Sequence, residues 1–318
     1  MILIGTSGWN YASGRGTWNG IFYPSRRRRG FDELAYYAEH FDTVEVNSSF
    51  YRMPEPGMSQ SWVRRTPRTF QFAVKLYQKF THPDMYLSRK EVTDWDLSLA
   101  DVDLFRRGID PLAEAGRLAA VLIQFPPSFQ AGVDTRDYLD WLLQALRGYT
   151  LAVELRHRSW SDDIADTLER LRAHAASWVL IDEPKFGSSI RQTGLREQTE
   201  SADDRSGLTY IRLHGRNAAQ WWDHDESEDR YNYLYSPAEL KPFANVARAA
   251  SSKSRRVLLY MNNHFSAKSV ANATILKHQL GQAITGEFPP EMVDRFPDLA
   301  GIVTSAAVPY DLPLDSRE

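Results

Sequence analysis

LAVELR, at residues 151–156, is one of eight short apolar runs in this chain that end in a polar or charged residue. The other seven are ILIGTS (2–7), TVEVNS (43–48), FQFAVK (70–75), AAVLIQ (119–124), WVLIDE (178–183), LTYIRLH (208–214) and RVLLYMNN (256–263). Short runs rich in β-branched residues and separated by helical segments are typical of parallel strands buried on both faces. Eight such units predict an α/β fold, a (β/α)8 barrel of the TIM type, whose active site lies where the strands end.

Helical periodicity fills most of the gaps between these runs. Apolar residues recur at helical spacing in 31–41, 135–147, 162–175, 237–250 and 267–284, and the long stretch 76–118 predicts a loop with more than one helix. A barrel needs roughly 250 residues, so a single domain with loop elaborations fits this chain better than two domains. We expect the barrel over 1–284, a mobile loop over 187–207, and a C-terminal extension over 285–318 that packs on the barrel or trails from it.

Composition excludes several classes of site. The chain contains no cysteine, which rules out disulfides, thiolate nucleophiles and cysteine-bound zinc or iron–sulfur centres. A net charge of −3 provides no global field for nucleic acid or anionic membranes. No apolar run approaches the roughly 20 residues that span a bilayer, and no signal-peptide pattern precedes the first strand. We therefore expect a cytoplasmic protein without a membrane partner.

Polar residues converge at the predicted strand ends. Because side chains alternate along a strand, positions two apart share a face. Stepping by twos toward each carboxyl end gives one set: Thr6, Glu45, Asn47, Lys75, Gln124, Glu154, Arg156, Asp182, Arg212, His214 and Asn262. If this face points inward, the barrel mouth holds three carboxylates, three fixed cations, a histidine and several amides.

Two interpretations of this ring stay open. In the functional one, an anionic substrate is held by Lys75, Arg156 and Arg212, and acid–base catalysis comes from Glu45, Glu154, Asp182 or His214. In the structural one, the same groups form a self-satisfied ion-pair network that closes the barrel, with Glu154 and Arg156 as simple partners. The position of active sites in barrels favours function.

A metal site is a separate question. Glu45, Glu154, Asp182 and His214 would together form an oxygen-rich site with one imidazole. Such a site suits manganese, magnesium or zinc. The cations of the same ring would repel a divalent ion, and no HxH or HExxH spacing occurs. The sequence therefore predicts no cofactor, with a divalent metal as the open alternative.

Several residues flank this ring as candidate rim contacts. TSGWNY (6–11) is either an anion-binding turn or a tight turn in which Trp9 covers the barrel edge. Tyr51, Arg52 and His82 follow the second and third strands, and His82 could reach inward. Aromatic residues also follow the seventh strand, and we expect their rings either to stack on a sugar or base or to pack on the rim. They are Trp221, Trp222, Tyr231, Tyr233 and Tyr235.

The ordered motifs of the chain resemble the DUF72, or YecE-like, family. They are GTSGWNY with WNGIFYP (18–24), FDTVEVNSSFYR (41–52), FAVK with THP (81–83), IQFPPSF (123–129), VELRHRSW (153–160), YIRLHGR (210–216) and YMNNHFSAKSVANA (260–273). The resemblance runs from near residue 2 to about residue 284 and implies a TIM-barrel-like fold. It places the ring residues other than Thr6, together with Tyr51, His157, Trp160 and Asn263, at motif positions, without implying a reaction or a role for any of them. A likeness to endonuclease IV-type and xylose-isomerase-type barrels is one of fold only.

The ring predicts an enzyme that binds a small phosphorylated or carboxylated compound by the residues that line the mouth. These are Thr6, Trp9, Asn47, Tyr51, Lys75, Gln124, Arg156, Arg212 and Asn262. Hydrolysis, isomerisation and lyase chemistry are all compatible with this set. A nucleic-acid-processing barrel and a non-enzymatic binding or scaffold protein remain as alternatives, and the sequence does not predict the oligomeric state.

Overall fold

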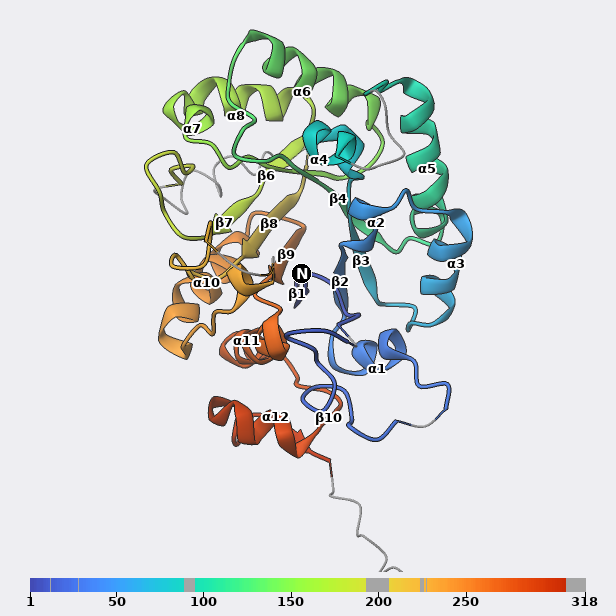
Figure 1. The fold of residues 1–318 in the computed structure, drawn as a ribbon, viewed down its shortest axis with the longest axis vertical. Helices are drawn as coiled ribbons and strands as arrows, with labels where there is room; N and C mark the ends of the chain where they lie inside the picture. Colours follow the sequence, from blue (N-terminus) through green and yellow to red (C-terminus); the bar gives the residue numbers. More distant parts are fainter. Residues whose placement is uncertain are drawn as a thin grey trace, which may run out of the picture.

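The computed structural model describes residues 1–11, 13–27, 29–88, 95–192, 206–223, 226 and 228–306. Its centre is a ring of parallel strands with helices around it (Figure 1), which confirms the predicted (β/α)8 barrel. The strands of the ring are β1 (Ile2–Thr6), β2 (Thr43–Val46), β3 (Gln71–Lys75), β4 (Leu118–Gln124), β5 (Leu151–Glu154), β6 (Ala176–Trp178), β7 (Leu180–Asp182), β8 (Leu208–Leu213) and β9 (Arg256–Met261).

The ring closes at two joints between two parallel sheets. One sheet has the order β1-β9-β8-β7 and the other β2-β3-β4-β5-β6. Ser7 bridges Glu45 just past the end of β1, and Gly8 N donates to Glu45 O at 2.8 Å. On the other side, β6 and β7 together form the sixth strand, which begins at Ala176, two residues before the predicted run 178–183. They join at Val179, whose N–H donates to Val153 O at 2.9 Å.

Helices surround the strands of the barrel. They are α1 (Glu33–His40), α2 (Ser48–Tyr51), α3 (Pro56–Arg64), α4 (Pro83–Leu87), α5 (Leu99–Glu114), α6 (Val133–Ala145), α7 (Ser159–Asp162), α8 (Ile164–Ala173), α10 (Pro237–Ala250) and α11 (Lys268–Gln279). Of these, α1, α6, α8, α10 and α11 correspond to the five stretches whose periodicity predicts them. Single 3₁₀ turns lie at η1 (Gln78–Phe80), η2 (Asp229–Tyr231) and η3 (Phe265–Ala267). The predicted helix 162–175 is divided at Asp163, and the one over 267–284 ends earlier, at Gln279.

Caps fix where these helices begin. Asp32 accepts from the backbone N–H groups of Leu34 and Ala35 and so starts α1. Ser236 and Glu239 form a reciprocal capping box at the start of α10. The longer helices turn buried apolar residues to the barrel, for example Leu34 and Tyr37 of α1.

The chain after α11 folds back onto the barrel. It contains β10 (Glu287–Phe288), α12 (Pro290–Arg295), η4 (Pro297–Leu299) and β11 (Thr304–Ser305), with β10 and β11 paired in parallel. Phe288, Met292, Phe296 and Leu299 are buried in the same core as the barrel. The division of the chain at residue 284 stays a prediction. Residues 307–318 and 193–205, which hold the rest of the predicted tail and most of the predicted 187–207 loop, lie outside the described residues.

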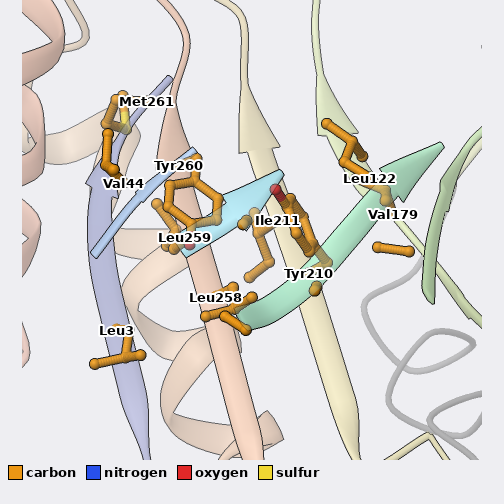
Figure 2. Packing of buried hydrophobic residues seen from close by; sticks show 14 of the residues in the cluster. Leu3, Val44, Leu122, Val179, Tyr210, Ile211, Leu258, Leu259, Tyr260 and Met261 are labelled. Carbon is orange, nitrogen blue, oxygen red and sulfur yellow. The ribbon is translucent and has the colours of Figure 1, made fainter. Parts of the chain in front are cut away.

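The interior of the barrel is filled by side chains below its mouth. Tyr210 of β8 and Tyr260 of β9 face each other with ring centroids 5.3 Å apart (Figure 2), and the Tyr260 hydroxyl lies 2.6 Å from Thr43 Oγ1. Burial raises the pKa of both tyrosines, so both hydroxyls are protonated. The floor of the mouth is therefore a packed, hydrogen-bonded layer.

Candidate functional site

An arginine pairs with two carboxylates directly above this tyrosine layer. Arg212 of β8 donates from Nε and Nη2 to the two oxygens of Glu45 at 2.9 and 2.7 Å, and from Nη1 to Glu154 Oε2 at 2.6 Å. The Tyr210 hydroxyl adds a bond to Glu45 Oε2 at 2.6 Å. All three charged side chains are buried, so the guanidinium compensates two carboxylates that would be costly to bury alone.

Glu154 extends this pairing to the upper edge of the mouth. Its Oε1 accepts from Arg156 Nε at 2.7 Å and lies 3.3 Å from His214 Nε2. Burial raises the pKa of Glu154, but Arg212 and Arg156 outweigh it and hold that pKa well below its ordinary value. Glu154 is therefore a permanent carboxylate that binds two arginines.

His214 is a neutral imidazole in this network. Burial lowers its pKa to about 3, although the Glu154 carboxylate opposes the shift. The ring nitrogens lie 3.2 Å from Arg156 Nη2 and 2.8 Å from Asn262 Nδ2. Because both nitrogens have partners, the imidazole is fixed in orientation.

Lys75 lies at the end of β3, and the contacts of its charged group differ from those of Arg156 and Arg212. Among the described residues, no carboxylate or hydrogen-bond acceptor lies within bonding distance of its Nζ, which instead stands 3.8 Å from the centroid of the Phe50 ring. Burial and the charge of Arg212 lower the pKa of Lys75 to about 7, although the Glu154 carboxylate opposes the shift. Its ε-amino group is therefore divided between charged and neutral forms near neutrality.

The structure places Glu183, not Asp182, at the mouth. In the register of β7 and β8, Asp182 is level with the outward-facing Leu213, whereas Ile181 is level with Arg212. The prediction of Asp182 as a ring carboxylate is therefore wrong by one residue. Its carboxylate lies outside the ring, where it accepts from Arg216 Nε at 2.8 Å and from the Tyr235 hydroxyl at 2.7 Å.

Glu183 lies beside Arg156 at the mouth, with Oε2 3.6 Å from Nη1. Burial raises the pKa of this carboxyl despite the opposing charge of Arg156. Its Oε2 is buried and has no hydrogen-bond partner among the described residues. A buried carboxyl with a raised pKa and an unused oxygen can exchange a proton with a bound molecule.

The prediction that Thr6 faces into the mouth is also wrong by one residue. Thr6 is level with Met261 of β9 and faces outward, where its Oγ1 donates to Gly8 O and contacts the Tyr37 hydroxyl at 3.0 Å. Ser7, which bridges Glu45, occupies the inward face instead. Ser7 Oγ is buried and lacks a hydrogen-bond partner within the described part of the chain.

The other predicted contacts divide between the mouth and its rim. Gln124 is buried and level with Glu154, so it belongs to the mouth, and Asn47 follows β2 with a buried, unpartnered Oδ1. Trp9 packs edge-on against Trp62, with ring centroids 5.9 Å apart. Tyr51 is an exposed residue of α2.

Aromatic side chains surround the opening. His264 lies between Tyr11 and Tyr231, with ring centroids 4.4 and 4.9 Å away. Near Lys75, His82 packs edge-on against Phe50 at 4.9 Å, and burial together with the Lys75 charge lowers its pKa to about 3. His82 also lines a cleft of about 360 Å³ with Thr81, Pro126 and Phe129.

Most of the remaining sequence candidates serve the rim. Arg52 pairs with Glu55 at 2.7 Å, and His157 contacts Ser159 at 2.9 Å. Trp222 is exposed beside Phe186. Trp221 and Tyr235 are buried, and Tyr233 packs edge-on against Tyr235.

Two absences apply to the part of the chain that the structure describes. In that part of the chain, no group of three or more His, Asp or Glu side chains is arranged to hold a metal ion. None of its helices combines the length and the apolar character needed to cross a membrane.

Comparison with known proteins identifies the family. The model described as "Protein of unknown function DUF72" matches residues 3–293, nearly the whole chain. The chain belongs to the DUF72 family. This confirms the resemblance carried by the sequence motifs.

Relatives of this DUF72 protein agree along the chain. The UPF0759 protein YunF of Bacillus subtilis is 30% identical over 302 residues, which cover 93% of this chain and 100% of YunF. The UPF0759 protein YecE of Escherichia coli O157:H7 is 26% identical over 186 residues, or 57% of this chain and 59% of YecE. A crystal structure of a DUF72 family protein from Thermotoga maritima is 31% identical, covers 89% of this chain and 100% of its own, and superposes with a TM-score of 0.72.

Proposed function

We propose that this DUF72 protein is an enzyme that binds a small anionic compound at the carboxyl end of its barrel. Lys75 and Arg156 hold the anionic group, and Glu183 exchanges a proton with the bound molecule. The observation that carries the proposal is the Lys75 ammonium, which has no carboxylate partner in the described residues although both neighbouring arginines are paired.

The charge balance of the mouth supports an anion. Burial raises the pKa of Glu183, which favours its neutral form. The ionised carboxylates of Glu45 and Glu154 are already bound by arginine. A protonated Lys75 then has no carboxylate within bonding distance among the described residues, and an anionic ligand would supply that partner.

Unused polar atoms support a ligand as well. Buried Ser7 Oγ, Asn47 Oδ1 and Glu183 Oε2 lack hydrogen-bond partners among the described residues. Leaving such groups unpaired costs about 1–3 kcal/mol each. A closed salt-bridge lattice accounts for Arg212 and its partners, but not for Lys75 or for these three atoms.

Calorimetric titration with inorganic phosphate and with malonate tests the proposal. The wild type should bind at least one of these probes at about pH 6, and binding should weaken as the pH rises through the pKa of Lys75, about 7. The matched control is Lys253→Met, which removes the same charge from an exposed position on the opposite, amino-terminal side of the barrel.

Lys75→Met should lose at least tenfold in affinity, whereas the Lys253→Met variant should bind like the wild type. Unchanged affinity in Lys75→Met would remove the assignment of Lys75. Absence of binding of both anions to the wild type would overturn the proposed function itself.

A further inference from the structure

We propose that the ε-amine of Lys75 is a nucleophile that condenses with an aldehyde or ketone group of the bound compound. This inference rests on the proposed function and deepens it, because it names an anionic carbonyl compound as the substrate class. Arg156 then holds the anionic group, and Lys75 takes the carbonyl carbon.

The position of Nζ is that of an available nucleophile. β3 is a paired strand of the barrel wall, hydrogen-bonded to β2 and β4, so it presents Lys75 from a rigid element. The Nζ lies over the Phe50 ring at 3.8 Å, and an aromatic face leaves the nitrogen lone pair of the neutral amine unused. A lysine bound to a carboxylate would instead be held as an ammonium ion, which has no lone pair to donate.

The charges around Nζ favour the reactive form. Burial lowers the pKa of Lys75 to about 7, and the guanidinium groups of Arg212 and Arg156 act in the same direction, against the carboxylates of Glu154 and Glu45. An ordinary lysine has a pKa near 10.4, so less than about 0.1% of its amine is neutral at pH 7. Lys75 offers about a thousandfold more neutral amine at that pH.

A cleft lies two side-chain contacts away from Lys75, which is not among its lining residues. His82 packs on Phe50, whose ring contacts Lys75, and it also lines the cleft of about 360 Å³ formed with Pro126 and Phe129. Burial and the Lys75 charge lower the pKa of His82 to about 3, so His82 adds no positive charge there. The cleft is large enough for a small compound of a few carbon atoms.

The condensation balances without another reactant. The nitrogen lone pair forms a bond to the carbonyl carbon, and one amine proton moves to the oxygen to give a carbinolamine. The nitrogen then expels the hydroxyl group, which leaves as water with the second amine proton. The product is an imine of Lys75, and addition of water reverses both steps.

Reductive trapping tests the inference with two probes. Wild-type protein is incubated at about pH 6.5 with sodium cyanoborohydride and either glyoxylate, an anionic aldehyde, or acetaldehyde, a neutral one. Peptide mass spectrometry then follows the label at Lys75 and at the exposed Lys253. We expect Lys75 to be labelled at least tenfold faster than Lys253, with glyoxylate faster than acetaldehyde, and inorganic phosphate to slow the glyoxylate reaction.

The outcomes separate this inference from the proposed function. If phosphate binds but Lys75 is labelled no faster than Lys253 by either aldehyde, the nucleophile is excluded and the anion site remains. If acetaldehyde labels Lys75 selectively and neither phosphate nor glyoxylate shows any preference, the nucleophile is supported and the anion site falls. In Lys75→Arg, the fast label should disappear while the slow labelling of Lys253 continues.

Discussion

Arg212 Nε and Nη2 bind the two oxygens of Glu45 at 2.9 and 2.7 Å, and so tie β8 to β2, two strands that are not neighbours in the barrel. The remaining Nη1 reaches Glu154 of β5 at 2.6 Å. One buried guanidinium thereby joins three sides of the barrel. The geometry makes Arg212 a structural centre of the mouth, with its donors taken by protein carboxylates rather than free for a substrate.

Arg212→Met should lower the free energy of unfolding by about 3–5 kcal/mol, because it leaves the buried Glu45 carboxylate without a cationic partner and removes one of the two arginines bound to Glu154. Denaturant unfolding followed by circular dichroism measures this loss. The matched control is Arg216→Met: Arg216 is partly exposed and also binds carboxylates, those of Asp182 and Glu239. It should cost less than about 1 kcal/mol. Equal losses in the two variants would show that the buried network contributes no more than a surface ion pair.

Lys75→Met should be more stable than the wild type below about pH 7. The folded-state pKa of Lys75 is lowered to about 7, whereas the unfolded chain keeps the ordinary value near 10.5. Between these values only the unfolded wild type binds the proton, so wild-type stability rises with pH by up to about 1.4 kcal/mol per pH unit. The advantage of Lys75→Met should therefore shrink toward about pH 10.

Urea unfolding at a series of pH values measures that difference, with Lys253→Met as the control. A constant difference between Lys75→Met and the wild type over this range would contradict the lowered pKa.

Loss of stability in acid should depend on His214. Its folded-state pKa is lowered to about 3, so between about pH 6.5 and 3 the unfolded chain binds a proton that the folded chain does not. Stability attributable to this group therefore falls as the pH falls. In His214→Gln, the slope of the free energy of unfolding between about pH 6 and 4 should decrease by about 1.4 kcal/mol per pH unit.

His278→Gln is the control for this slope, because His278 is exposed at the end of α11. It should leave the slope unchanged. The same slope in both variants would show that His214 is not the neutral imidazole described here.

Gly5→Ala should be strongly destabilising. A Cβ at Gly5 would stand 2.2 Å from Thr43 O, where β1 and β2 meet, and a backbone oxygen cannot move aside. We expect a loss of about 3 kcal/mol or more in denaturant unfolding. Gly57→Ala in α3 meets nothing within 4 Å and should be neutral or stabilising by up to about 1 kcal/mol. Wild-type stability in Gly5→Ala would mean that this joint of the barrel is wider than described.

The sequence was sufficient to predict most of this site. The alternation of side chains along each strand correctly predicts that Glu45 and Arg212 share one face. It does so because the apolar neighbours on each strand occupy the opposite face, toward the helices. It failed where two successive polar residues end a strand. Thr6 and Ser7 are both hydroxyl residues, and Asp182 and Glu183 are both acids, so the pattern does not tell which one faces inward.

Which of the three cations pairs with a carboxylate could not be predicted from the sequence either. Lys75, Arg156 and Arg212 are equivalent as charges in the sequence, but their side chains start from different heights in the barrel. Arg212 lies level with Tyr260 and reaches both carboxylates, whereas Lys75 leans over Phe50, a residue of α2 outside the predicted ring. The distinction between a structural and an available cation depends on these three-dimensional contacts.

A crystal structure of the protein grown with malonate tests the central claim most directly. We predict a carboxylate oxygen of malonate within about 3 Å of Lys75 Nζ, near Arg156, while Arg212 remains bound to Glu45 and Glu154. Lys75 Nζ bound to Glu45 or Glu154, with malonate found only away from the mouth, would contradict it.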